Sequence, residues 1–248
     1  MEAMMAVVVV TGASRGVGAE TAVALGARGH DVVVNYREKE RRAEKVCDLV
    51  REAGGRAIAV GADVTSPDGP ASLLDAAVAA FGAVDVVILN ASGGLELGAD
   101  EDYAMRLNRD AQVAAARAAA DRLRPGGRIV FVTSHQAHFS ESRPVPAGYE
   151  PIAASKLAGE RALRALAAEL DLDLRVVSGD MIEGTIIVRL LERRDPAAVE
   201  ARRAHGPLPT VTEFAAAIAG AVDSEGPDTT YVGGHDYFGV ASLAWVEE

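Results

Sequence analysis

Hydrophobic residues along the chain form short unbroken runs, separated by longer segments in which alanine alternates with charged residues. Unbroken runs rich in valine are typical of strands that are buried on both faces of a parallel sheet. They predict strands at 6–11, 31–36, 56–61, 84–90, 127–134 and 174–179, with a weaker one at 229–234.

The intervening segments predict helices, at 17–28, 38–53, 70–81, 101–123, 151–170 and 186–204. Regular alternation of strands and helices indicates an α/β protein with a doubly wound parallel sheet and right-handed crossovers. No linker, repeat or low-complexity tract interrupts the pattern, so a single domain is expected over residues 1–248. Ligands of such sheets bind at the carboxyl ends of the strands.

Composition and charge narrow the classes of function. The net charge of −11 argues against nucleic-acid binding, because a phosphate backbone favours a positive surface. No apolar run is long enough to cross a membrane, and the start has no basic segment, so a cytoplasmic protein is expected. Cys47 is the single cysteine, which excludes an internal disulfide, and its helical surroundings predict a core position. We predict no metal site.

A glycine-rich stretch, TGASRGVGAE, follows the first predicted strand and opens the first predicted helix. Glycine at positions 12, 16 and 18 permits a tight turn and lets a pyrophosphate approach the start of the helix. Unpaired N–H groups and the helix dipole favour an anion there. The stretch therefore predicts a dinucleotide-binding site.

The spacing of these glycines resembles that of the short-chain dehydrogenase/reductase family, and further stretches match the family in order. They are GADVTS, LNASGG, LNRD, FVTSHQ, AASK and SGDMIEGT, with Ser178 where the family has proline. The resemblance covers about residues 5–235 and implies a Rossmann-like fold with a nicotinamide cofactor.

The resemblance also implies the residues of the site. The family's catalytic positions fall on Ser134, Lys156 and Asn108, and Lys156 would also grip the nicotinamide ribose. Its cofactor-binding positions fall on Gly12, Ser14, Arg15, Gly16, Val17, Gly18, Asn35, Tyr36, Arg37, Asp63, Val64, Asn90, Ala91, Ser92, Gly93, Lys156, Ile182 and Thr185.

The end of the second predicted strand, VNYREK, bears on the choice of cofactor. Members that prefer NAD usually carry a carboxylate there, whereas this chain has Arg37. Together with Arg15 it would bind a 2′-phosphate through charge-assisted hydrogen bonds, which favours NADPH and leaves NADH as the alternative. Equally, Arg37 could pair with Glu38 or Glu40 at the start of a helix.

One expected side chain is missing. The family places its proton-donating tyrosine four residues before the lysine, and here that position is Ile152. Pro151 is expected in the first helical turn, so Tyr149 would lie before the helix. The candidate donors are Ser134, His135, His138, Tyr149 and a hydroxyl group of the substrate itself, and the sequence does not choose among them.

This combination resembles atypical ketoreductases that tailor antibiotics. It implies an NAD(P)H-dependent reduction of a ketone in an aromatic polyketide of the angucyclinone type, with substrate-assisted protonation. Two alternatives are a reductase of the 3-oxoacyl-carrier-protein kind and a non-catalytic NADPH sensor. The expected partner is a small aromatic ketone, with neither nucleic acid nor membrane, and the family implies a homo-oligomer, either a dimer or a tetramer.

Overall fold

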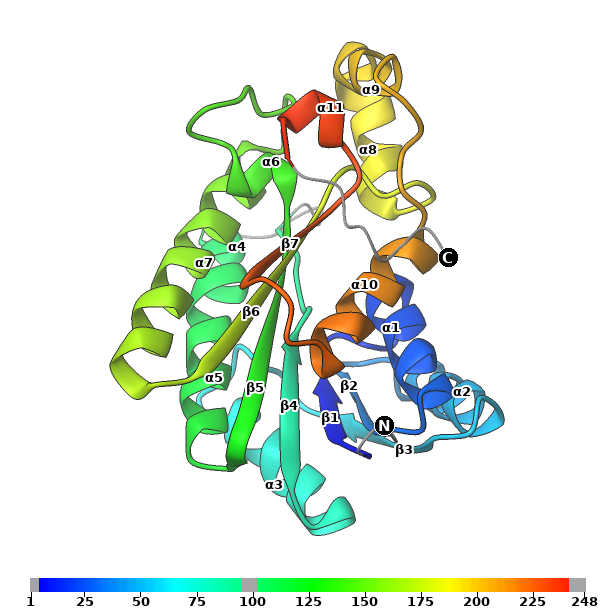
Figure 1. Cartoon of the computed structure of the whole chain (residues 1–248), viewed down its shortest axis with the longest axis vertical. Coiled ribbons are helices and arrows are strands. Elements are labelled where there is room, and N and C mark those ends of the chain that lie inside the picture. Colours follow the sequence, from blue (N-terminus) through cyan, green and yellow to red (C-terminus); the bar gives the residue numbers. More distant parts are fainter. Residues whose placement is uncertain (1–4, 95–101, 241–248) are drawn as a thin grey trace.

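The central element is one parallel β-sheet. The computed structural model of the chain describes residues 5–94 and 102–240. Within them the strands are β1 (Val7–Val10), β2 (Asp31–Tyr36), β3 (Arg56–Gly61), β4 (Val84–Leu89), β5 (Leu123–Ser134), β6 (Asp173–Gly179) and β7 (Thr229–Val232). Their order in the sheet is β3-β2-β1-β4-β5-β6-β7, with all neighbours parallel (Figure 1). The predicted doubly wound, Rossmann-like sheet is confirmed.

The valine runs are unbroken because both faces of each strand are buried. Val8 and Val10 contact the core on one face of the sheet, and Val9 contacts the core on the other. Side chains of a strand alternate between its faces, so a run of valines supplies two cores at once.

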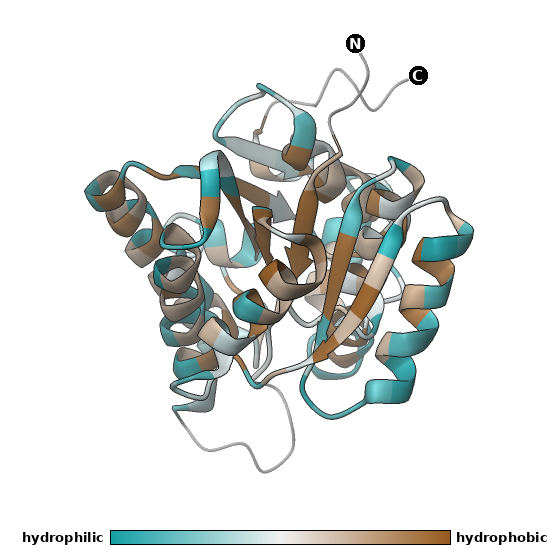
Figure 2. Cartoon of the chain, turned by 90° about the horizontal axis from the view of Figure 1, so that it is seen from below, coloured by the Kyte–Doolittle hydropathy of each residue, from teal (hydrophilic) through white to brown (hydrophobic). Residues whose placement is uncertain are grey.

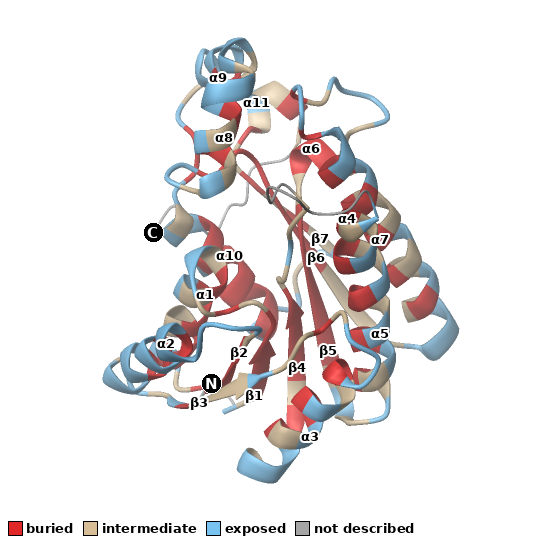
Figure 3. Cartoon of the chain, turned by 180° about the vertical axis from the view of Figure 1, so that it is seen from behind, coloured by how far each residue is buried: buried red, intermediate tan, exposed pale blue. Residues whose placement is uncertain are grey.

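Helices cover the sheet in two layers (Figure 1). Helices α1 (Gly16–Ala27), α2 (Glu40–Glu52) and α10 (Val211–Asp223) pack on one face, and α3 (Gly69–Phe81), α5 (Ala111–Ala120) and α7 (Glu150–Leu170) pack on the other. Figure 2 shows hydrophobic strands at the centre and hydrophilic stretches on the outer helices, and Figure 3 shows the matching burial. Cys47 lies in the first core as predicted, and burial raises the pKa of its thiol to about 11.

The sequence patterns did not predict α10. Its thirteen residues are mostly alanine and other apolar residues, because the helix packs between α1 and the strands β5, β6 and β7. A capping box was the missed signal. The Thr210 hydroxyl accepts from the backbone N–H of Glu213, and the Glu213 carboxylate accepts from the backbone N–H of Thr210.

Two predicted helices are in fact divided. The segment predicted at 101–123 contains α4 (Tyr103–Met105), the π-helical turn η1 (Arg106–Asp110) and α5, and its last residue already belongs to β5; Glu101 lies outside the described residues. The segment predicted at 186–204 is α8 (Ile186–Arg194) followed by α9 (Pro196–Arg203). The break occurs because Asp195 leaves the helical conformation and caps α9 by accepting from the N–H of Ala198.

A third apolar cluster lies at the carboxyl ends of the strands. There α6 (His135–His138), α8, α9 and α11 (His235–Phe238) stand above the sheet (Figure 1). The cluster includes Tyr149 and Ile152 from the start of α7, Met181 from the segment after β6, and Val188 from α8. This cluster packs at the same edge of the sheet as the predicted site residues.

Candidate active site

The glycine loop between β1 and α1 has the shape that a pyrophosphate requires. Gly12 and Gly16 have φ angles of 64° and 59°, which favour glycine over any residue with a side chain. At Gly18 a Cβ atom would lie 2.5 Å from the Asn90 side chain and 2.8 Å from the Gly12 carbonyl oxygen. The loop therefore packs closely against Asn90 at Gly18. Arg15 is exposed, and Ser14 and Val17 are half-buried.

Asn90 ties this loop to the end of β4. Its side-chain amide donates to the Thr11 carbonyl oxygen at 2.9 Å, and the Thr11 hydroxyl accepts the backbone N–H groups of Asn90 and Ala91 at 2.9 and 3.0 Å. The half-buried Gly93 and the exposed Ser92 follow directly. The structure therefore brings LNASGG against the glycine loop, as the sequence order implied.

Three predicted cofactor residues that are buried, Asn35, Val64 and Ile182, make their contacts within the protein. The Asn35 side chain accepts the Gly12 N–H at 3.1 Å and donates to the Val60 and Ala62 carbonyl oxygens at 3.3 and 3.0 Å. Val64 and Ile182 pack into the two cores. Asn35 thus shapes the glycine loop, and direct cofactor contacts by these three residues stay predictions.

Arg37 lies just after β2 and makes contacts on two sides. One guanidinium nitrogen, Nη1, donates to the Tyr103 hydroxyl at 2.8 Å, and Nη2 lies 3.2 Å from the Glu38 carboxylate. The alternative pairing with Glu38 is therefore present, alongside a contact with Tyr103 that no sequence signal indicated. Asp63 is near the same place, where its carboxylate accepts from the Thr65 backbone and hydroxyl at 2.9 and 2.7 Å. Tyr36 instead folds over Gly61.

Ser134 ends β5, and its hydroxyl lies 3.1 Å from that of Tyr149. Tyr149 is the N-cap residue of α7, before the helix as expected, and its side chain is 4 % exposed. Burial raises the pKa of the Tyr149 phenol, and the Ser134 hydrogen bond offsets only part of that increase. The two hydroxyls form a partly buried pair at the carboxyl edge of the sheet.

Lys156 lies on α7 one turn after Ile152. Its ammonium donates to the Val132 carbonyl oxygen at 3.1 Å, and burial lowers its pKa from 10.5 to about 8. Ile152 is 2 % exposed and belongs to the apolar cluster, so the side chain one turn before Lys156 is apolar and buried.

Asn108 lies in η1 and connects the end of β4 with α7. Its amide donates to the Gly93 carbonyl oxygen and to the Ser155 hydroxyl, both at 2.9 Å. A Cβ at Gly159 would lie 2.2 Å from the Asn108 carbonyl oxygen, so α7 crosses η1 at a glycine. Asn108 therefore fixes the position of the helix that carries Ile152 and Lys156.

The histidine candidates are occupied by protein partners. The ring nitrogens of His135 lie 2.8 Å from the Ser178 hydroxyl and 3.0 Å from the Gly233 carbonyl oxygen, and burial lowers its pKa to about 3. Those of His138 lie 2.8 Å from the Glu160 carboxylate and 3.1 Å from the Tyr231 hydroxyl. His135 is neutral at physiological pH, and both rings are held by hydrogen bonds to other parts of the protein.

The segment after β6 is held by a buried ion pair that sequence reasoning missed. Arg202 of α9 donates through Nε to the Asp180 carboxylate at 2.5 Å, and both side chains are at most 2 % exposed. Gln136 donates to the other carboxylate oxygen at 3.3 Å. Between these anchors Thr185 caps α8 by accepting the Val188 N–H. The pair fixes α9 above the predicted cofactor residues Ile182 and Thr185.

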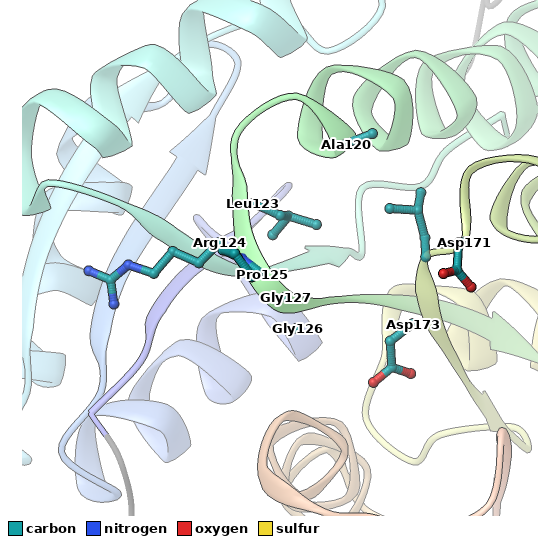
Figure 4. Close-up of a pocket in the computed structure, with 9 residues that line it drawn as sticks. Ala120, Leu123, Arg124, Pro125, Gly126, Gly127, Asp171 and Asp173 are labelled. Atoms are coloured by element: carbon teal, nitrogen blue, oxygen red, sulfur yellow. The ribbon is translucent and has the colours of Figure 1, made fainter.

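Other features lie apart from this edge. A shallow cavity of about 470 Å³ lies at the opposite end of the sheet, between the start of β5 and the α7–β6 turn (Figure 4). It is lined by Arg124, Gly126, Asp171 and Asp173 among others, and none of the predicted site residues reaches it. Within residues 5–94 and 102–240, no cluster of side chains suits a metal ion, and no helix is long and apolar enough to span a membrane.

Comparisons with known proteins agree with this geometry. The model of the short chain dehydrogenase family matches residues 6–179. Versicolorin reductase stcU of Emericella nidulans is 46 % identical over 138 residues, which are 53 % of this chain and 52 % of that protein. A hydroxynaphthalene reductase-like protein, Arp2, of Metarhizium majus is 40 % identical over 140 residues, 54 % of this chain and 52 % of that protein. This chain therefore spans about half the length of the curated relatives it matches.

Among solved structures, a short chain dehydrogenase from Burkholderia cenocepacia in complex with NADP superimposes with a TM-score of 0.77. It is 31 % identical, over 92 % of this chain and 96 % of that one. The family match, the sequence similarity and the fold agree with one another. The chain belongs to the short-chain dehydrogenase family.

Proposed function

We propose that the protein is an NADPH-dependent ketoreductase that acts on a ring ketone of an aromatic polyketide, with a proton supplied by the substrate. One observation carries the proposal. Ser134 and Lys156 lie at the carboxyl edge of the sheet near an intact glycine loop, while Ile152 fills the position of the family's acid.

The residues present fit a dinucleotide. The positive φ angles of Gly12 and Gly16 give the tight turn that a pyrophosphate-binding loop needs. The exposed Arg15 and half-exposed Arg37 supply positive charge for a 2′-phosphate. Lys156, at the carboxyl edge, would bind the ribose hydroxyls of the nicotinamide half. When bound, NADPH supplies the hydride.

Among the described residues near Ser134, Tyr149 and His135 are poor acids. Burial raises the pKa of the Tyr149 phenol, and the hydrogen bond with Ser134 offsets only part of that increase, so the phenol is a weaker acid than a free tyrosine. His135 is neutral. The Ser134 hydroxyl, held by Tyr149, can donate a hydrogen bond to the ketone oxygen. The proton that neutralises the reduced oxygen would then come from a phenol hydroxyl beside the ketone.

Two similarities support the class of substrate. The relatives are named for versicolorin and hydroxynaphthalene reduction. In addition, the stretches YEPIAASK and SGDMIEGT resemble the angucyclinone C7 ketoreductase of the simocyclinone pathway. We therefore propose an angucyclinone-type ketone as the substrate.

The test is NADPH consumption with two matched aromatic ketones, one flanked by a free phenol and one with that phenol methylated. We expect the free phenol to react faster by about 10²–10⁴, the usual contribution of acid catalysis. Equal rates for the pair would refute substrate-assisted protonation. NADPH binding without turnover of any aromatic ketone would refute the reductase and favour a sensor.

A further inference from the structure

The contact between Arg37 and Tyr103 joins two segments that lie far apart in the sequence. Arg37 follows β2, whereas Tyr103 begins α4, which comes after β4. In the sheet β2 and β4 flank β1, so the hydrogen bond of 2.8 Å passes over the edge from which the glycine loop emerges. Residues on both sides of the loop are thereby connected.

This contact restrains a side chain that would otherwise be mobile. The Arg37 side chain is 48 % exposed. An exposed arginine samples many rotamers, and this freedom is lost when it binds a ligand. The Tyr103 hydroxyl on Nη1 and the Glu38 carboxylate near Nη2 hold the guanidinium in one place before any ligand arrives.

Charged side chains of both signs surround the Arg37 guanidinium. The Arg106 guanidinium lies 5.8 Å from the centre of the Tyr103 ring. Arg37 also acts on Asp63: burial opposes ionisation, but hydrogen bonds from Thr65 and the charge of Arg37 lower the pKa of that carboxyl. A tyrosine hydroxyl thus organises a guanidinium without adding a negative charge.

We infer that Tyr103 is a positioning residue for cofactor selectivity, which holds Arg37 ready for the 2′-phosphate of NADPH. The inference rests on the proposed use of NADPH. A guanidinium held in place loses less rotamer freedom when it binds a phosphate, so the affinity gain applies to the phosphorylated cofactor alone. NADH, which lacks the phosphate, gains nothing from the contact.

The experiment is titration of the full chain with NADPH and with NADH, followed by the fluorescence of the bound nicotinamide, without any ketone. Tyr103→Phe keeps the ring and its contact with Arg106 but removes the hydroxyl. We expect its Kd for NADPH to rise about three- to tenfold, the usual effect of one hydrogen bond, and its Kd for NADH to stay unchanged. Tyr237→Phe, on α11, is the matched control and should alter neither Kd.

A second pair of variants tests whether Tyr103 acts through Arg37. In an Arg37→Gln background, Tyr103→Phe should have no further effect on NADPH binding. An equal loss for both cofactors, or an additive loss in the double variant, would overturn the inference, as would an unchanged Kd for NADPH. If the wild-type chain shows this selectivity but reduces no ketone, the proposed reductase activity fails while the inference stands.

Discussion

Lys156 and Tyr149 are buried titratable residues at the start of one helix, and burial shifts the two pKa values in opposite directions. The pKa of the Lys156 ammonium is lowered and that of the Tyr149 phenol is raised, because burial penalises the charged form of each. At neutral pH both side chains are therefore protonated. Only the lysine titrates near the physiological range.

The first prediction concerns the pH dependence of cofactor binding. NADPH is anionic, so it favours the charged lysine and raises its pKa above the free-protein value of about 8. Binding therefore takes up a proton above that pH, and log Kd should rise with pH by up to about one unit per pH unit. Titrations between neutral and alkaline pH measure the slope. A flat profile for the wild type, or the same slope in Lys156→Met, would contradict the assignment.

A second prediction separates the two hydroxyls of the partly buried pair. Ser134→Ala should lower kcat by about 10²–10³, as the loss of a donor to a developing oxyanion does. Tyr149→Phe should lower it only about tenfold and leave KM unchanged, because it removes one hydrogen bond to Ser134. Steady-state kinetics with the phenol-flanked ketone decide. If Tyr149→Phe proves as damaging as Ser134→Ala and removes the alkaline limb of the pH profile, Tyr149 is the acid.

At the scale of elements, one buried ion pair links the end of β6 to α9. Arg202 also donates to the Gly206 and Pro207 carbonyl oxygens at 2.9 and 3.2 Å, so one side chain connects the end of β6 with the segment that follows α9. Burial raises the pKa of the Asp180 carboxyl even though Arg202 opposes that shift. Each of these buried charges would lack its main ionic partner if the other were removed.

The third prediction follows from that pair. Arg202→Met leaves a buried carboxylate without its partner and should reduce the free energy of unfolding by about 3–5 kcal/mol. Replacing Asp180 by leucine as well should restore most of the loss, since an apolar pair of similar volume is tolerated there. Arg203→Met is the control. Arg203 pairs with Glu183 and Glu192 in an exposed position, so that change should cost at most about 1 kcal/mol.

Urea unfolding of the four proteins, monitored by circular dichroism, measures these differences. A double variant as unstable as Arg202→Met would show that the charges themselves, and not the stranded carboxylate, stabilise this segment.

For the molecule as a whole, the sheet was predictable and parts of its cover were not. Strands at 31–36 and 56–61 were predicted at the bounds that the structure has. Short runs rich in apolar and β-branched residues usually form buried strands, which is why these predictions were accurate. Helix α10 was missed because its alanine-rich sequence lacks the polar face by which outer helices are recognised. The division at Asp195 was missed because a capping aspartate before proline resembles one more polar helical residue.

The candidate site was predicted in its motifs and missed in its contacts. A resemblance in order could locate Ser134, Lys156 and Asn108 along the chain. It could not show that Tyr149 reaches Ser134, because the intervening loop has no periodicity from which its path could be read. The same holds for Tyr103 and Arg37, which come from different loops. Assembly into a homo-oligomer and the cytoplasmic location stay predictions.

The Asp180–Arg202 pair also limits how this chain can be recombined with its relatives. A segment covering 186–204, transplanted from a relative, would bring its own residue to position 202 while position 180 stays with this chain. Unless both positions are exchanged together, the chimera keeps a buried charge at one position without its partner at the other. Exchange of the segment 186–204 should therefore succeed when position 180 is changed with it, and fail when the segment is exchanged alone.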